Sequence, residues 1–241
     1  MMRNNIYIVF LVLFACSTLQ IDDSIESVFN NGKESLSKSN YNRAKGEFEF
    51  VILNSPLSSY ASDAYFYLAE SKFYLGKYED AIIDYEKYLN IPVRDVFLSK
   101  KCELMICKSW FNLSNNVMKD QTETKIAIDK LQYYIEKDSM LEYIMQINDM
   151  ILSLRNRLAE KDFKTALLYM QLEKNESALI YFQNIIDRFY DSNYVEESVL
   201  NIAYIKAKEN KENAINYLML NQASFISGSK FQDAIDNISK K

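Results

Sequence analysis

The chain has 241 residues, of which 49% are apolar, while only four are glycine and two are proline. This composition favours long helices joined by short turns over a sheet protein or a disordered chain. A net charge of −5 without a block of like charge argues against nucleic-acid binding, and the absence of histidine removes the most common general base and most zinc sites. We therefore expect an all-α protein without catalytic residues, metal or dissociable cofactor.

The first fifteen residues are typical of a secretory signal segment. Arg3 precedes a ten-residue apolar run, Ile6 to Ala15, which is too short to span a bilayer core of about 30 Å. The run ends in Leu13-Phe14-Ala15-Cys16, which resembles the lipobox of bacterial lipoproteins, where cleavage before the cysteine accompanies its acylation. We expect a mature chain that begins at Cys16 and is held at the membrane by a covalent lipid. A cleaved soluble export signal is the alternative.

Residues 16–23 are expected to form a short linker behind the lipid. A fully extended segment of this length reaches only about 25 Å. The folded part, residues 24–241, is therefore expected to stay close to the membrane surface. Ser17, rather than an aspartate, follows the cysteine, which favours the periplasmic face of the outer membrane over retention in the inner membrane.

The folded part repeats a helix-turn-helix unit. In the clearest copy, Ala64 to Pro92, Tyr65 and Leu68 share one helical face and Gly76 stands where the first helix must end. Large residues follow one small residue of each second helix, four and seven positions later. The small residues are Ala44, Ala81, Ala127, Ala178 and Ala214. This pattern matches the tetratricopeptide (TPR) repeat of about 34 residues.

The spacings between these alanines are 37, 46, 51 and 36 residues, so two copies contain insertions. The stretch Asn112 to Thr124 lacks periodicity and is expected to include a loop, whereas Leu141 to Leu168 stays periodic and is expected to lengthen a helix. An apolar stripe from Phe231 to Ile238 predicts a terminal helix over the last repeat. The sequence therefore predicts an α-solenoid of about five TPRs, with an irregular helical bundle as the alternative.

The most specific motifs lie in and around the fourth repeat. Leu154-Arg155-Asn156-Arg157-Leu158-Ala159-Glu160 precedes Asp187-Arg188-Phe189-Tyr190-Asp191-Ser192, and Ser55-Pro56-Leu57-Ser58-Ser59-Tyr60-Ala61 separates the first two repeats. Together they resemble the BamD family, lipoproteins of the complex that inserts β-barrels into the Gram-negative outer membrane. The chain departs from the family's pattern at Tyr190 and Asp138-Ser139, where proline-containing turns are usual.

The resemblance implies a non-enzymatic scaffold of the β-barrel assembly (BAM) complex. It implies that the N-terminal repeats receive unfolded barrel precursors, and that the C-terminal repeats dock the POTRA region of the barrel protein BamA, beside other BAM lipoproteins. Transferred by motif, the docking candidates are Arg188, Arg155 and Arg157. Arg188 comes first, because a planar bidentate donor near a helix end suits a carboxylate on a partner. Solvated or internally paired arginines are the alternative.

A peptide groove is a second expectation. Aligning Ala44 with Ala81 places five residues on the surface where TPR proteins generally hold extended peptides: Phe29, Lys33, Phe66, Glu70 and Phe73. An exposed aromatic ring beside a charged residue would suit a terminal aromatic residue of a precursor. Burial of these aromatic side chains in the core is the alternative.

Two other functions stay open. One is a different exported TPR adaptor lipoprotein, such as a secretin pilotin or a Tol-Pal or cell-envelope coordinator. Many Tol-Pal coordinators begin with a heptad-rich coiled coil, which this sequence lacks. The other is a TPR-bearing cell-wall enzyme, for which no residues remain to build a catalytic domain.

Overall fold

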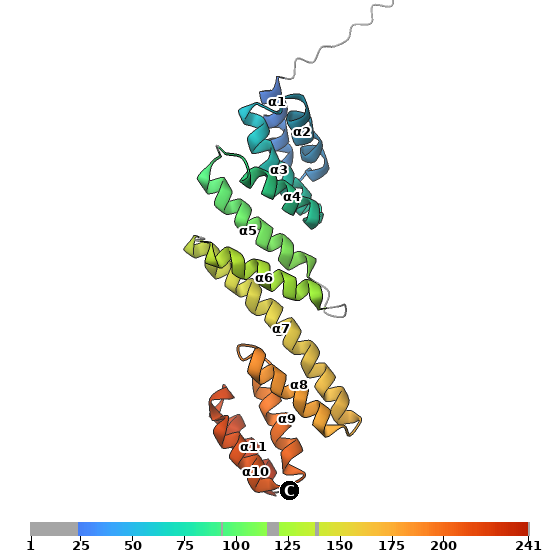
Figure 1. Cartoon of the computed structure of the whole chain (residues 1–241), viewed down its shortest axis with the longest axis vertical. Helices are drawn as coiled ribbons and strands as arrows, with labels where there is room; N and C mark the ends of the chain where they lie inside the picture. Colours follow the sequence, from blue (N-terminus) through green and yellow to red (C-terminus); the bar gives the residue numbers. More distant parts are fainter. Residues whose placement is uncertain (1–23, 93, 115–120, 138–139, 241) are drawn as a thin grey trace, which may run out of the picture.

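The computed structural model is a rod of antiparallel helix pairs (Figure 1). It describes residues 24–92, 94–114, 121–137 and 140–240. Within these ranges the helices are α1 (Ile25–Ser37), α2 (Tyr41–Asn54), α3 (Ser59–Tyr74), α4 (Tyr78–Leu89), α5 (Val96–Leu113), α6 (Thr122–Glu136), α7 (Leu141–Gln171), α8 (Asn175–Arg188), α9 (Val195–Ala207), α10 (Lys211–Leu220), a short η1 (Gln222–Ser224) and α11 (Gly228–Lys240). The first ten α-helices form five successive pairs, which confirms the predicted TPR solenoid.

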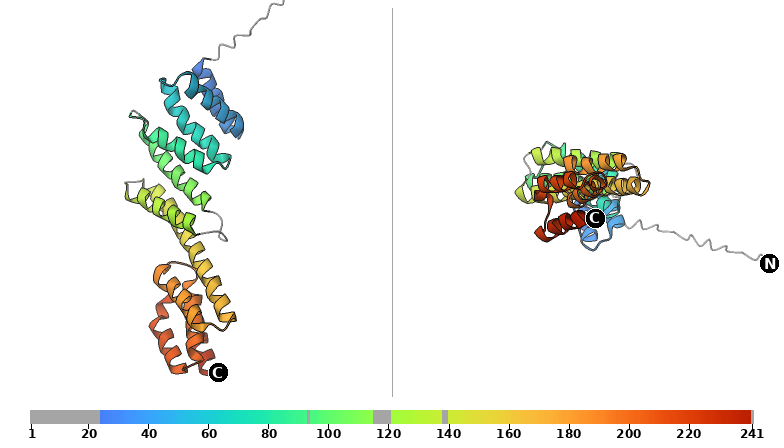
Figure 2. Two further views of the ribbon diagram at one scale, coloured as in Figure 1. Left: turned by 45° about the vertical axis from the view of Figure 1, so that its right-hand side comes forward. Right: turned by 90° about the horizontal axis from the view of Figure 1, so that it is seen from below.

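Each pair closes on the small residue of its second helix. All five aligned alanines are fully buried, and so are the large residues four positions later, which are Phe48, Tyr85, Leu131, Phe182 and Leu218. A small side chain lets two helix axes approach, and the large neighbour fills the space beside it. A helix pair has one apolar face that only the next pair can cover, so the pairs stack along one axis (Figure 2).

The fifth pair departs from the predicted pattern at its end. The residues seven positions after the other four alanines are buried, but Asn221 is not a packing residue. Helix α10 is only 10 residues long, so Asn221 lies just past its last residue. There its Nδ2 donates a hydrogen bond of 2.8 Å to the carbonyl oxygen of Tyr217. This asparagine therefore caps the helix instead of filling the core.

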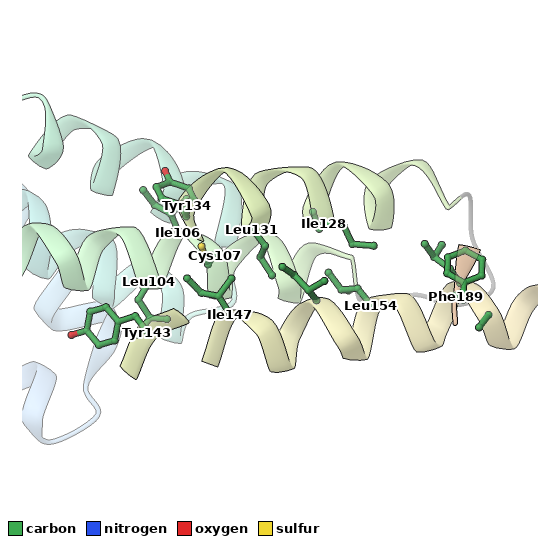
Figure 3. Packing of buried hydrophobic residues seen from close by; sticks show 14 of the residues in the cluster. Leu104, Ile106, Cys107, Ile128, Leu131, Tyr134, Tyr143, Ile147, Leu154 and Phe189 are labelled. Atoms are coloured by element: carbon green, nitrogen blue, oxygen red, sulfur yellow. The ribbon is translucent and has the colours of Figure 1, made fainter. Parts of the chain in front are cut away.

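Helix α7 has 31 residues and joins the third pair to the C-terminal pairs (Figure 1). Its first half presents Tyr143, Ile147 and Leu154 to buried residues of α5 and α6 (Figure 3). Its second half packs against α8, where the rings of Phe163 and Phe182 meet with centroids 5.6 Å apart. The predicted lengthening of this helix is confirmed. Helix α5 ends at Leu113 and α6 begins at Thr122. Residues 115–120 of the loop predicted between Asn112 and Thr124 lie outside the described residues.

Helix α11 covers the fifth pair, as its apolar stripe predicts. Its buried residues Ala234 and Ile238 join a separate apolar cluster with α9 and α10. An ionic contact holds the beginning of the helix. Lys230 Nζ lies 2.7 Å from Oε1 of Glu196 and 2.6 Å from Oε1 of Glu197, both in the first turn of α9. Glu196 is therefore buried but ion-paired.

Acid is expected to loosen α11. Burial opposes ionisation of Glu196, but Lys230 and the backbone amide of Ile226 lower the pKa of its carboxyl below the ordinary 4.5. Such a group stabilises the folded state above its unfolded pKa and loses that contribution as the pH falls through its folded pKa. The loss is expected to be below about 1 kcal/mol, because Lys230 is half exposed.

Hydrogen exchange measures this effect. The protection factors of α11 amides should fall as the pH drops from neutral to below 4.5, while those of α2, at the other end of the rod, stay constant. Lys230→Ala should lower the protection of α11 at neutral pH and remove most of its pH dependence. An identical pH response in the variant and the parent chain would contradict the assignment.

Two glycines are required by geometry. Gly76 follows α3 with a φ of +74°, in the left-handed region that its position predicts. Gly32 lies in α1 against the ring of Phe48, where an added Cβ would come within 2.7 Å of Cε1. Gly46 in α2 differs, because nothing lies within 4 Å of a Cβ added there.

Gly32→Ala is expected to destabilise the first helix pair by about 1–3 kcal/mol, because the new Cβ would force the fully buried ring of Phe48 to shift. Gly46→Ala is the matched control. It is expected to stabilise the chain by about 0.5–1 kcal/mol, since alanine loses less backbone entropy in a helix. Denaturant unfolding followed by circular dichroism measures both, and shifts of the same sign would be inconsistent with this packing.

Candidate partner-docking site

Arg155 on α7 is engaged within the chain. Its Nε lies 2.8 Å from both carboxylate oxygens of Asp191, and its Nη2 donates a hydrogen bond of 2.7 Å to the carbonyl oxygen of Arg188. The guanidinium also lies over the rings of Phe189 and Tyr190, 5.7 and 5.4 Å from their centroids. Arg155 therefore clamps α7 to the end of α8 and positions Arg188.

Arg157 faces a different neighbour. Its guanidinium lies 4.7 Å from the ring centroid of Phe111, and its Nη1 donates a 3.4 Å hydrogen bond to the carbonyl oxygen of Ser114. Burial lowers the pKa of this guanidinium, which nevertheless stays protonated because an arginine pKa begins so high. Arg157 therefore ties α7 to the end of α5, and it does not share a site with the other two arginines.

Arg155 and Arg188 do come together at a pocket of about 540 Å³ between α6, α7 and α8. Its lining includes three buried apolar side chains, those of Ile128, Leu158 and Phe189. We call it the basic pocket, and it is defined by all of its lining residues: Gln121, Lys125, Ile128, Asp129, Gln132, Arg155, Leu158, Lys161, Asp162, Asn184, Arg188 and Phe189.

The basic pocket carries an excess of positive charge. Asp191 neutralises Arg155, which leaves the exposed residues Lys125, Lys161 and Arg188 opposite Asp129 and Asp162. Burial raises the pKa of Asp162, against the opposing effects of a hydrogen bond from Asn184 and the charge of Arg188. A positive pocket on a chain with net charge −5 suits an acidic segment of a partner.

Arg188 is one of three exposed cations of the basic pocket, with Lys125 and Lys161. Its side chain is exposed in the last turn of α8, and within the described part of the chain it makes no ion pair. The sequence motif predicts this residue but not Lys125 or Lys161. Both lysines lie on other helices, and a single lysine on a helical surface carries no motif.

The five peptide-groove candidates do not form one surface. Phe29 is 6% exposed and Phe66 is 1% exposed, and both belong to the apolar core. Glu70 is also buried, and Lys101 Nζ lies 2.6 Å from its Oε1. The expectation that these three side chains are exposed is therefore wrong. Phe29 on α1 packs against rings of α2 and α3, whereas Phe66 and Glu70 lie on α3, which α2, α4 and α5 cover.

Two of the five candidates reach solvent. Lys33 is exposed, with its Nζ 5.8 Å from the ring centroid of Phe29 and 5.4 Å from that of Tyr67. Phe73 is half-buried against Tyr78, with ring centroids 5.4 Å apart. Only these two remain candidates for contact with a peptide.

The expected lipidation residue, Cys16, and the linker behind it lie outside the described residues. Among the helices that the structure describes, none combines the length and the apolar character that a membrane crossing requires.

Comparison with known proteins gives a family match. Residues 21–218 match the family model described as YfiO, outer membrane lipoprotein. The outer membrane protein assembly factor BamD of Rickettsia prowazekii is 22% identical over 193 residues, which cover 78% of this chain and 76% of that protein. The BamD of Caulobacter vibrioides is 21% identical over 194 residues, and the match covers 78% of this chain but only 62% of that protein.

Solved TPR structures are also similar. The TPR domain of P58(IPK) is 15% identical with a TM-score of 0.40, and the match covers 89% of this chain and 54% of that chain. A thermophilic TPR protein of Thermus thermophilus is 11% identical with a TM-score of 0.37, and the match covers 90% of this chain and 100% of that chain.

Proposed function

Because this chain belongs to the YfiO family of outer membrane lipoproteins, we propose that it is a non-enzymatic scaffold for the assembly of outer membrane β-barrel proteins. Its BamD relatives are described as outer membrane protein assembly factors. In a stack of helix pairs, each pair offers its own surface, which suits a protein that holds several partners at once.

The basic pocket docks an acidic segment in the POTRA region of a BamA-like barrel protein. The observation that carries this proposal is Arg188, which is exposed, has no ion pair among the described residues, and lines a pocket with Lys125 and Lys161 on an otherwise acidic chain. Arg188 binds the partner's carboxylate. Arg155 acts on Arg188 through the carbonyl hydrogen bond that fixes the end of α8.

The proposed scaffold has three further roles, each given to a different part of the chain. Acylated Cys16 anchors the N-terminal end to the periplasmic face of the outer membrane. The N-terminal repeats, with Lys33 and Phe73 at the surface, receive unfolded barrel precursors. Other BAM lipoproteins bind elsewhere on the rod.

Co-purification tests the scaffold proposal. The full-length protein is solubilised in mild detergent and captured, and a POTRA-containing barrel protein is expected in the eluate. Capture of a secretin or of Tol-Pal components in its place would favour the other adaptor functions.

A variant of the lipidation residue tests the anchor. Cys16→Ser is expected to leave the protein soluble or uncleaved, because the acyl chains are lost. Membrane fractionation and the size of the chain measure this outcome. Tight membrane association of a cleaved Cys16→Ser chain would refute the lipid anchor without touching the docking proposal.

A further inference from the structure

Three apolar side chains of α2 and of the turn that follows it are exposed. Helices α1 and α2 lie at one end of the rod (Figure 1). Phe50 and Leu53 lie one turn apart at the end of α2 and are 46% and 82% exposed, and Leu57 in the turn to α3 is completely exposed. Single exposed leucines are common on proteins, but here three exposed apolar residues fall within eight positions of the sequence. We call these three apolar residues the polar-end patch, where "polar" refers to the pole of the rod and not to the chemistry of the side chains.

The turn that carries Leu57 is well defined. The amide of Ser58 donates a hydrogen bond of 3.0 Å to the carbonyl oxygen of Ser55, and the Ser58 hydroxyl donates one of 2.8 Å to the same oxygen. Ser58 Oγ also accepts from the amide of Ala61 at 3.1 Å, which caps α3. Pro56 restricts the backbone of the same turn. The turn therefore holds Leu57 outward.

The polar-end patch lies beside the first turn of α1. The ring of Tyr60, three residues after Leu57, packs on Phe29 with centroids 5.4 Å apart. Burial, together with the neighbouring Glu26, raises the pKa of the Tyr60 hydroxyl. The turn before α3 is thus adjacent to the point where the N-terminal linker enters the fold. Because an eight-residue linker extends only about 25 Å, a lipid on Cys16 would keep this end of the rod at the bilayer.

We propose that Phe50, Leu53 and Leu57 insert into the interfacial region of the bilayer that holds the lipid anchor, and so fix the orientation of the rod. This inference rests on the lipidation of Cys16 in the proposed function. Two contact points, the acyl chains and the polar-end patch, restrict the tilt that a single flexible tether would allow. The far end of the rod, with its basic pocket and last helix pair, then points into the periplasm.

Charge is not expected to drive this contact. The charged neighbours on α2, Lys45 and Glu49, form an ion pair of 2.9 Å with each other, and the neighbour on α1 is Glu26. Lys72 and Lys87 line the same pocket as Phe50 and Leu53, but both pair with Asp84. Attraction to anionic headgroups needs a cluster of unpaired basic side chains. Insertion should therefore proceed in zwitterionic vesicles and persist at high salt.

A fluorescent probe at Leu57 tests the inference. Leu57→Cys in the full lipidated chain is labelled with an environment-sensitive fluorophore and reconstituted into phosphatidylcholine vesicles. Cys102 and Cys107 are fully buried and their thiol pKa values are raised by burial, that of Cys107 to about 12, so labelling at neutral pH is selective. Ile226→Cys is the matched control, since Ile226 is 95% exposed and belongs to the C-terminal end of the rod.

The inference predicts a blue shift for the probe at position 57 and quenching by nitroxide-labelled lipids, with neither effect at position 226. Flotation of the vesicles reports the anchor independently, so a chain that fails to float refutes lipidation and not the patch. A chain that floats while both probes remain in water overturns the inference. A probe at position 57 that shifts only when the POTRA-containing protein is added also overturns it, and assigns the patch to protein contact.

Discussion

Replacing Arg188 with glutamate is expected to weaken binding of the POTRA-containing partner by roughly 30-fold or more, which corresponds to about 2 kcal/mol. Arg188 is an exposed cation of the basic pocket and has no ion pair among the described residues, so the variant replaces attraction by repulsion of an acidic partner. Arg188→Lys should lose less, because it keeps the charge but not the bidentate geometry. Titration calorimetry at two salt concentrations measures affinity and its electrostatic share.

Lys174→Glu is the control for this variant. Lys174 precedes the first residue of the same helix, is exposed, and lies outside the basic pocket, so it undergoes the same charge change at the opposite end of α8. Its affinity should match that of the parent chain. Equal loss of affinity in both variants would mean that binding follows net charge and not the basic pocket.

Phe182→Ala is expected to lower the free energy of unfolding by about 3–5 kcal/mol, because it leaves a cavity in the fourth pair. Phe182 is fully buried and meets Phe163 of α7. In a solenoid each pair depends mainly on its neighbours, so the loss should be local. Circular dichroism reports the whole chain, whereas Trp110, the single tryptophan, reports α5 in the third pair.

The two signals should separate in this variant. Part of the dichroism should be lost at lower denaturant concentration, while the fluorescence transition moves less. Leu168→Ala is the control, because Leu168 is on α7 but 54% exposed, and its effect should stay within about 0.5 kcal/mol. Coincident shifts of both signals after Phe182→Ala would indicate a single cooperative core instead of stacked pairs.

The helix pairs were predictable because their signals are local. Ala44 and Ala178 are followed at helical spacing by Phe48 and Phe182, and each set forms a buried face within one helix. Gly76 is recognisable because the end of a helix often needs a left-handed residue. Such features depend on neighbours a few residues away, which a sequence displays directly.

Which side chains are exposed and unpaired was less predictable, because this depends on residues that are distant in the sequence. Arg155 and Arg188 look equivalent in the sequence. In the structure Arg155 pairs with Asp191, which lies 36 residues away in the chain, and Arg188 does not. Likewise, periodicity groups Phe66 with Glu70 on one face of α3, but it cannot indicate that α5 covers this face. Long-range packing thus decided which predicted site residues reach solvent.

Reconstituted barrel assembly tests the central claim most directly. Vesicles carrying the POTRA-containing barrel protein are prepared with and without the lipidated chain, and the conversion of an unfolded outer membrane precursor into its folded, heat-modifiable form is followed over time. The account predicts faster conversion with the parent chain and loss of that gain with Arg188→Glu. The same rate with and without the parent chain would contradict it.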